Sequence, residues 1–203
     1  GVNGELLDNE VTQMPTDTNT GTKKIWDAGL SEGHSLYDHF MREWAGVDPA
    51  TGSGLWNMYY NDIDNDGIFN GNDQNIANMT LFMAANPDAN VKKTPTSNYA
   101  QATQKYVGKS AIPKVRGAFR LNAEYKNFDI MAQFSYSIGG HVIDSGYQTL
   151  MDNGDLIGSN NFHTDIKNAW QQPGDITNVP RTSAAFAADT QFNSISTRFL
   201  TEA

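Results

Sequence analysis

The feature that most constrains this chain is a pair of eleven-residue segments, 115–125 and 128–138, in which apolar and polar side chains alternate. The first apolar set consists of Val115, Phe119, Leu121, Ala123 and Tyr125, with the small Gly117 in the same phase. The phase switches after Lys126-Asn127, and the second set consists of Phe128, Ile130, Ala132, Phe134, Tyr136 and Ile138. A two-residue turn explains the switch, because pairing Tyr125 with Phe128 places both sets on one face. The alternation therefore predicts a two-faced antiparallel hairpin over 114–138, with Phe119 opposite Phe134.

Each arm is long enough to cross the apolar band of an outer membrane. At roughly 3.3 Å per residue and a tilt of about 45°, such an arm covers roughly 25 Å, the height of that band. Arg116, Arg120 and Glu124 lie on the polar face, where a wet barrel lumen would solvate them and a dry core would not. A soluble antiparallel sheet with one solvated face gives the same alternation, so both interpretations stay open at this point.

The lengths of the connections favour the membrane interpretation. Lys126-Asn127 joins the arms directly, whereas their other ends meet long irregular segments. Outer-membrane barrels have short periplasmic turns and long external loops. Tyr125, Phe128 and Tyr136 stand near the ends of the arms, where interfacial aromatic girdles lie. Ordinary cross-strand aromatic packing is the alternative explanation for these three rings.

Composition narrows the classes of protein that fit. The 203 residues are 38% hydrophobic, with a mean hydropathy of −0.54, which is low for a packed globule. No run approaches the ~20 apolar residues of a membrane helix, which leaves strands as the spanning option. The chain has no cysteine, so thiolate metal sites are excluded. A net charge of −9 disfavours nucleic acid as a partner.

A second feature is the run 62–73, whose spacing is that of an EF-hand-type calcium loop. Its positions 1, 3, 5, 6, 8 and 12 hold Asp62, Asp64, Asp66, Gly67, Phe69 and Asp73. A hard cation takes six to eight oxygens, and a tight turn at Gly67 lets three carboxylates converge while the carbonyl of Ile68 adds a ligand. We therefore predict a structural Ca2+ site with Asp62, Asp64, Asp66, Ile68 and Asp73 as ligands. Asp73 replaces the usual Glu, so weaker binding is expected; a merely solvated acidic turn is the alternative.

Other motifs give little support for catalysis. The four histidines, His34, His39, His141 and His163, lack the spacing of a zinc-protease motif. Ser35 follows Gly33-His34 without the second glycine of a nucleophile elbow. No glycine loop of the phosphate-binding type is present. We expect a protein that is not an enzyme.

The remaining stretches predict little regular structure. Ser35 and Asp38 have a spacing close to that of a helix capping box, so a short helix is expected over 35–44. A second short helix is expected over 164–171. The polar stretch 57–113 is expected to be mostly loop.

Five blocks, in this order, resemble the C-terminal part of SusC/RagA-type TonB-dependent outer-membrane transporters. They are EGHSLYDHFMREWAGVDP (32–49), DIDNDGIFNGND (62–73), IPK (112–114), YKNFD (125–129) and RFLTEA (198–203). The ordered set is far more specific than any single block. The turn departs from the family pattern, because Asn127 stands where the family usually has glycine; asparagine tolerates a positive φ.

The resemblance implies an all-β fold: a segment of a large antiparallel transmembrane β-barrel, with 22 strands in the family, whose long extracellular loops carry short helices. It divides the chain into a partial barrel strand (1–14), an extracellular loop region with the calcium-type loop (15–113), the transmembrane hairpin (114–138), an extracellular loop with short helices (139–197) and the start of the next strand (198–203). The chain is expected to be a fragment, because it contains neither the plug domain nor the TonB box of such transporters.

The function implied by the resemblance is import of oligosaccharides or peptides across the outer membrane of a Bacteroidetes-type bacterium. The implied partners are a SusD-like surface lipoprotein, TonB acting through other parts of the protein, outer-membrane lipid and the transported oligosaccharide or peptide. The alternative is a secreted, calcium-ordered carbohydrate-binding module of β architecture.

Overall fold

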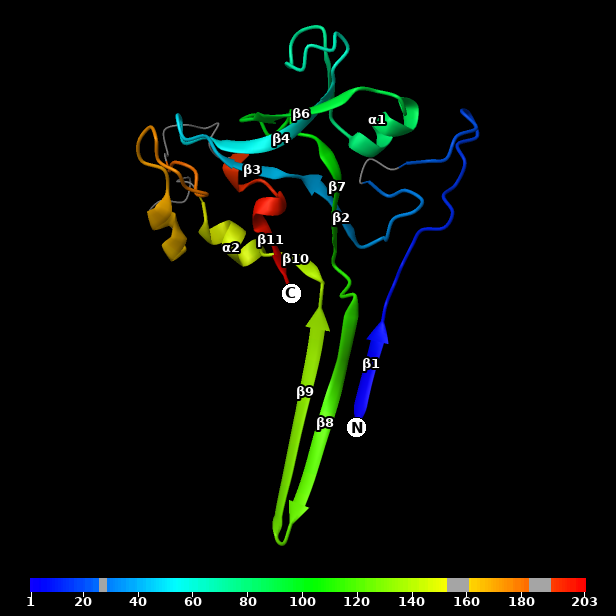
Figure 1. Ribbon diagram of the computed structural model, residues 1–203, viewed down its shortest axis with the longest axis vertical. Coiled ribbons are helices and arrows are strands. Elements are labelled where there is room, and N and C mark those ends of the chain that lie inside the picture. The colour runs from blue at the N-terminus through cyan, green and yellow to red at the C-terminus, as the bar shows by residue number, and fades with distance from the viewer. Residues whose placement is uncertain (26–28, 153–160, 183–190) are drawn as a thin grey trace.

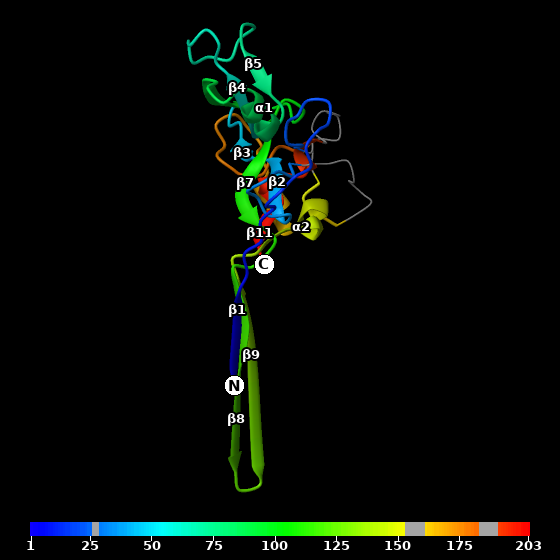
Figure 2. The same ribbon diagram turned by 90° about the vertical axis from the view of Figure 1, so that its right-hand side faces the viewer.

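The structure, a computed structural model, describes residues 1–25, 29–152, 161–182 and 191–203. These residues form a long three-stranded sheet that projects from a head of shorter elements (Figures 1 and 2). The hairpin sheet consists of β1 (Val2–Leu6), β8 (Val115–Tyr125) and β9 (Phe128–Ile138), in the order β1-β8-β9. All of its strand pairs are antiparallel. We call the rest of the described residues the head.

The head is built mainly from antiparallel strands. Its elements are β2 (Asp38–Arg42), β3 (Trp44–Val47), β4 (Gly54–Asn61), β5 (Gln74–Ile76), α1 (Met79–Ala85), β6 (Val91–Thr96), β7 (Gln104–Ser110), β10 (His141–Ile143), α2 (Ser145–Leu150), η1 (Thr164–Asn168), η3 (Thr197–Phe199) and β11 (Leu200–Glu202). β4 is the centre of a four-stranded sheet, with β6 along one edge and β3 and β5 along the other. β2 pairs with β7, and β10 with β11. The predicted all-β class is confirmed, and the sheets are open.

The register of the hairpin is the one that the alternation predicts. Tyr125 pairs with Phe128, Phe119 with Phe134, and the ladder continues to Val115 and Ile138. The rings of Phe119 and Phe134 stack with centroids 4.7 Å apart. The left-handed residue of the turn is Lys126 (φ 55°), one position before the expected Asn127. The turn thus keeps its predicted length while the positive φ falls on its first residue.

β1 extends both faces of the hairpin by one strand. Val2, Gly4 and Leu6 pair with Phe119, Gly117 and Val115, and so lie on the apolar face. Asn3 and Glu5 lie on the polar face, where Glu5 forms an ion pair with Arg116. The sequence did not reveal this pairing, because β1 and β8 are far apart in the chain and β1 is short. The strand covers only part of the predicted span 1–14.

The apolar face of the hairpin sheet is uncovered. Leu121, Ile130 and Phe134 are 61%, 66% and 51% exposed, and none of the described elements packs over them. Figures 1 and 2 show the sheet standing clear of the head from two directions. Met131 is also exposed (63%), but it pairs with Asn122 and therefore lies on the polar face. An apolar surface of this extent marks a contact with a membrane or with another protein surface.

The head has its own small cores. One contains Trp56, Ala102 and Phe192, with Trp44 and Tyr99 packed against it; the other contains Met151, Val179 and Phe199, with Ile143, Tyr147, Ile166 and Ala169 around it. Trp56 contacts Trp44 and Tyr99 edge to face, with centroids 5.5 Å and 5.3 Å apart. Alternate residues of β4 are buried, so this strand anchors the head through one face. The described helices are short, and none has the length and apolar character needed to cross a bilayer.

The helix predicted over 35–44 is wrong. The Ser35 amide does donate to the Asp38 carboxylate (3.1 Å), as the capping spacing suggested, but the contact closes a turn. The residues that follow form β2, which pairs with β7. Long-range strand pairing therefore overrides a weak local helix signal.

The stretch 57–113, predicted to be mostly loop, contains more regular structure than expected. This stretch contains most of β4, together with β5, α1, β6 and β7. β6 has the sequence VKKTPT, which lacks an apolar alternation because the strand lies at the edge of its sheet. Over 164–171, a 3-10 helix covers only Thr164–Asn168. The strand predicted over 198–203 is present as β11, after a turn of 3-10 helix.

Replacing Gly117 by Ala is expected to destabilise the hairpin sheet. A Cβ at this position would lie 2.4 Å from the Asn3 carbonyl oxygen and 2.6 Å from the Tyr136 hydroxyl oxygen. Because one obstacle is backbone, β1 must shift, at a cost of about 1–3 kcal/mol in the free energy of unfolding. Denaturant unfolding of the purified protein measures this.

Gly71→Ala is the matched control, since its Cβ would meet open space and its φ is not positive. A Gly117→Ala variant as stable as Gly71→Ala would contradict the proposed close packing of β1 on β8.

Candidate functional site

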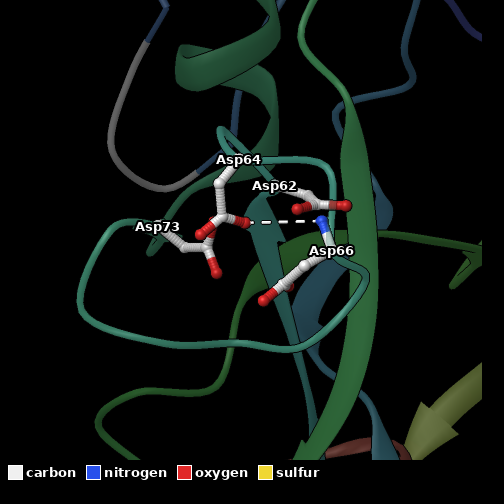
Figure 3. A group of neighbouring side chains, drawn as sticks. All are labelled: Asp62, Asp64, Asp66 and Asp73. Atoms are coloured by element: carbon white, nitrogen blue, oxygen red, sulfur yellow. Dashed lines mark hydrogen bonds between the residues drawn. The ribbon is translucent and has the colours of Figure 1, made fainter.

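The predicted acidic loop connects β4 to β5 at the end of the head remote from the hairpin sheet (Figure 1). Asp62 directly follows β4, and Asp73 directly precedes β5. Together with Asp64 and Asp66, they present one oxygen each, and these four oxygens lie within 4.8 Å of one another (Figure 3). The structure thus brings together the four carboxylates that the spacing predicted.

Backbone turns hold the first half of the loop in place. Gly67 has a φ of 75°, in the left-handed region that glycine tolerates. The Gly67 amide donates to Asp62 Oδ2 (3.1 Å), and the Ile68 amide donates to Asp66 Oδ1 (2.7 Å). The Asp66 amide donates to Asp64 Oδ1 (3.4 Å), which Figure 3 marks. Each aspartate therefore turns its carboxylate toward the inside of the loop.

Asp73 closes the loop despite its short side chain. Its Oδ1 accepts from the Ile63 amide (3.0 Å), and its Oδ2 accepts from the Asn70 amide (3.0 Å). The carboxylate therefore bridges the beginning and the second half of the loop. An aspartate in place of the expected glutamate is accommodated because the chain draws Asp73 close to the other three.

Asn70 shows where the acceptors of the loop converge. Its Nδ2 donates to Asp64 Oδ2 (3.1 Å), to Asp66 Oδ2 (3.1 Å) and to the Ile68 carbonyl oxygen (3.2 Å). One donor group is thus shared by three of the predicted ligands. The Ile68 carbonyl, the predicted backbone ligand, thus faces the same donor as the Asp64 and Asp66 carboxylates.

Asp62 is the buried member of the cluster, with 2% of its surface exposed. Its Oδ2 accepts from Gly67 and from Asn90 Nδ2 (3.3 Å), while no donor among the described residues reaches Oδ1. The Asp62 amide also donates to the Asn90 carbonyl (2.9 Å). Asn90 therefore ties the loop to the segment before β6. Sequence reasoning missed this residue, because it lies outside the motif and carries no spacing signal.

The loop is electrostatically negative. Hydrogen bonds from the Asn72 and then the Asn70 side chain hold the pKa of Asp64 below its usual value. The pKa of Tyr60 is raised by its burial and by the charges of the four aspartates. The Tyr60 ring contacts Phe69 edge to face at 5.3 Å, so the aromatic residue at position 8 anchors the loop on β4.

A second polar cluster, which the sequence analysis missed, lies around Glu43. Glu43 Oε2 accepts from the Tyr59 hydroxyl (2.9 Å) and from Asn57 Nδ2 (3.3 Å), and its Oε1 pairs with Lys105 Nζ at 3.2 Å. Burial acts to raise the pKa of Glu43, but Tyr59 and Lys105 outweigh it and lower that pKa. Burial acts to lower the pKa of Lys105, and Glu43 raises it. The cluster links β7 to the β2–β3 junction and β4.

Arg198 is a largely buried cation in the head. Its guanidinium lies over the rings of Trp44 and Phe199, with centroids 5.0 Å and 4.9 Å away, and Nη1 donates to the Phe192 carbonyl (2.9 Å). Burial lowers the pKa of Arg198 to about 10. Arg198, which belongs to the RFLTEA block, therefore connects aromatic residues of the two head cores.

The histidines lie away from the acidic loop. His39 Nε2 and the His141 carbonyl oxygen are 2.8 Å apart, which joins β2 to β10 above the hairpin sheet. His34 stacks on Tyr106 with centroids 3.5 Å apart. His163 accepts a hydrogen bond from the Asp165 amide at the start of a 3-10 helix. These contacts connect segments of the head.

Comparison with known proteins finds similarity at the level of three-dimensional structure. No family model matches the chain, and no curated protein matches it. The RagAB peptide transporter has a TM-score of 0.55 at 24% identity over 94% of this chain. The RagAB peptide importer in the "closed-closed" state has a TM-score of 0.55 at 24% identity over 87% of this chain. In the "open-open" state it has a TM-score of 0.57 at 22% identity over 92% of this chain.

The chain corresponds to 15–17% of the length of those transporter chains. It has the fold of that part of them, which confirms at the level of fold the resemblance found in the sequence. The proteins that share this fold are described as transporters and importers of peptides.

Replacing Glu43 by Gln is expected to lower the free energy of unfolding by about 1 kcal/mol at neutral pH, because Lys105 and Tyr59 lose a charged acceptor. The folded-state pKa of Glu43 is lowered, so its contribution is present above the usual carboxyl pKa and is lost as the pH falls through the lowered value. The folded-state pKa of Lys105 is raised, so the lysine's contribution is lost only as the pH rises through that raised value.

Denaturant unfolding of both proteins between about pH 3 and pH 9 measures the difference, which should shrink at the acidic end. Glu10→Gln is the control, because Glu10 is exposed. A Glu43→Gln effect of equal size at every pH would contradict the role assigned to the carboxylate charge.

Proposed function

We propose that this chain is part of a SusC/RagA-type, TonB-dependent importer in the outer membrane. The observation that carries the proposal is the hairpin sheet, which has one apolar and one polar face and no cover over the apolar side among the described elements. The fold shared with the RagAB structures supports the same conclusion. The activity, substrates and partners assigned below belong to the whole transporter.

The apolar face of the hairpin sheet is proposed to contact lipid. It consists of Val2, Leu6, Val115, Phe119, Leu121, Tyr125, Phe128, Ile130, Phe134, Tyr136 and Ile138, with Gly4, Gly117, Ala123 and Ala132 between them. Water would leave this surface unfavourably hydrated, whereas hydrocarbon would match it. A secreted carbohydrate-binding module would need a second layer over the face, and the described residues supply none.

The polar face is proposed to line a wet lumen. Arg116 and Glu5 form an ion pair there, and Arg120 pairs across the ladder with Gln133. Such groups are costly in hydrocarbon and tolerable against water. The outer edges of β1 and β9 lack strand partners among the described residues, and a bilayer requires such edges to be paired. Neighbouring strands of a barrel would provide that pairing.

The head is proposed to lie on the extracellular side. The Lys126-Asn127 turn is short, as periplasmic turns are, while the head comprises the long connections at the other end of the sheet. β11 runs antiparallel to β10, and the Ala203 amide donates to the Gly140 carbonyl (2.9 Å). The chain at this point thus heads toward the outer edge of β9, in the direction a further barrel strand would take.

The proposed partners follow from the transporter class. A SusD-like lipoprotein would cap the extracellular side, and TonB would act through other parts of the protein. Peptides are the favoured cargo because the similar solved structures are of peptide importers, with oligosaccharides as the alternative. Co-purification of the full-length protein with such a lipoprotein and a retained peptide supports the assignment, whereas a full-length product that stays soluble without detergent contradicts it.

The lipid-facing assignment is tested by a matched pair of arginine substitutions. Leu121 and Met131 are exposed to nearly the same degree, 61% and 63%, but lie on opposite faces of the hairpin sheet. Leu121→Arg is expected to destabilise the inserted protein by about 2–4 kcal/mol, the usual cost of arginine at the bilayer midplane. Met131→Arg should be nearly neutral, because a wet lumen solvates the charge.

The measurement is the folded fraction of the full-length protein in isolated outer membranes, read as heat-modifiable mobility on gels, together with unfolding in vesicles. Equal losses for the two variants, or a harmless Leu121→Arg, would refute the assignment of the faces.

A further inference from the structure

We infer that the loop 62–73 binds one calcium ion through Asp62, Asp64, Asp66, Asp73 and the Ile68 carbonyl. This inference is independent of the proposed transport function, since it rests on the head alone. Exposed aspartates often occur close together without a cation, so proximity of the four carboxylates is only the starting point. A second feature, at Asp62, points to a bound cation.

Asp62 Oδ1 is a buried carboxylate oxygen without a hydrogen-bond donor among the described residues. The residue is 2% exposed, so water does not replace the missing donor across an open surface. Leaving such an oxygen unpartnered is costly, and more so for a charged group than for a neutral one. Figure 3 shows the Asp62 side chain turned toward the other three carboxylates, where a cation would satisfy it.

The hydrogen bonds of Asn70 show that further acceptors of the loop converge. Its amide group donates to Asp64, Asp66 and the Ile68 carbonyl at 3.1–3.2 Å, which means that three acceptors are aimed at one small volume. The four aspartates, whose oxygens lie within 4.8 Å of one another, also repel one another, and a divalent cation would offset that repulsion. One bound cation would therefore satisfy the converging oxygen acceptors and offset the negative charge of the loop.

The ligand chemistry selects calcium among common divalent cations. All the groups offered are oxygens, four from carboxylates and one from a backbone carbonyl, which suits a hard cation. Ca2+ accepts six to eight oxygens in irregular geometry, whereas Mg2+ demands a near-ideal octahedron and retains its waters. Asp73 in the closing position favours affinity in the range of extracellular modules, about 10⁻⁴–10⁻³ M.

A bound ion would hold three chain segments in one arrangement. Asp62 follows β4, Asp73 precedes β5, and Asn90 hydrogen-bonds Asp62 from the segment before β6. Ile63 and Ile68, which the loop presents to solvent, would be held in one arrangement. The ion is thus structural, and its effect is to hold these segments of the head in place.

The test is Ca2+ titration of the purified full-length protein by isothermal calorimetry, alongside Tb3+ luminescence sensitised by nearby aromatic residues and displaced by Ca2+. We expect saturable binding, with Mg2+ at least tenfold weaker. Asp62→Asn keeps the shape of the side chain, removes its charge and should weaken Ca2+ binding at least a hundredfold. Asp66→Asn, at an exposed position, should weaken it at least tenfold without a folding defect.

Asp88→Asn is the control, since Asp88 is an exposed acid of the head outside the loop. Its affinity for Ca2+ should equal that of the unmodified protein, and circular dichroism verifies that each variant is folded. The inference is overturned if the unmodified protein shows no saturable Ca2+ signal up to several millimolar, or if folded Asp66→Asn binds as tightly as Asp88→Asn. Loss of lipid insertion in the arginine variants above would leave this result unchanged, so the two proposals fail separately.

Discussion

The backbone ladder between β8 and β9 is the constraint on which the rest of the structure depends. A two-residue turn fixes the register, and the register decides which face every side chain of both strands occupies. A slip by one residue would mix charged groups into the apolar face and destroy the difference between the two surfaces. β1 adopts the same division when it pairs with β8, so three strands share one boundary between apolar and polar surroundings.

The two ends of the molecule present different kinds of surface. At one end the hairpin sheet offers apolar surface over its whole length; at the other the acidic loop concentrates negative charge on the tip of the head. Between them, β4 and its neighbours form a small core around Trp56, which positions the loop without touching the hairpin sheet. Because the two regions are separate, the proposed membrane contact and the proposed cation binding do not depend on each other.

The sequence predicted the hairpin and the acidic cluster because both are encoded locally. The alternation over 114–138 contains its own register, and the loop over 62–73 needs only turns between neighbouring residues. The head was mispredicted because β2, β6 and β7 are short edge strands stabilised by distant partners, so their sequences lack a clear alternation. The sequence did not predict the roles of Asn90, Glu43 and Arg198 for the same reason. These roles arise from contacts with residues elsewhere in the sequence, which no local pattern reveals.

The pairing of β1 sets an order of assembly. The hairpin closes across two residues, so its ladder can form from the turn with little loss of chain entropy. The contact between Gly1 and Arg120, by contrast, joins residues 119 positions apart in the sequence. Everything from β2 to β7 lies within that closure. Docking β1 onto β8 therefore costs more chain entropy than closing the hairpin, and β1 is expected to join the sheet after β8 and β9 have paired.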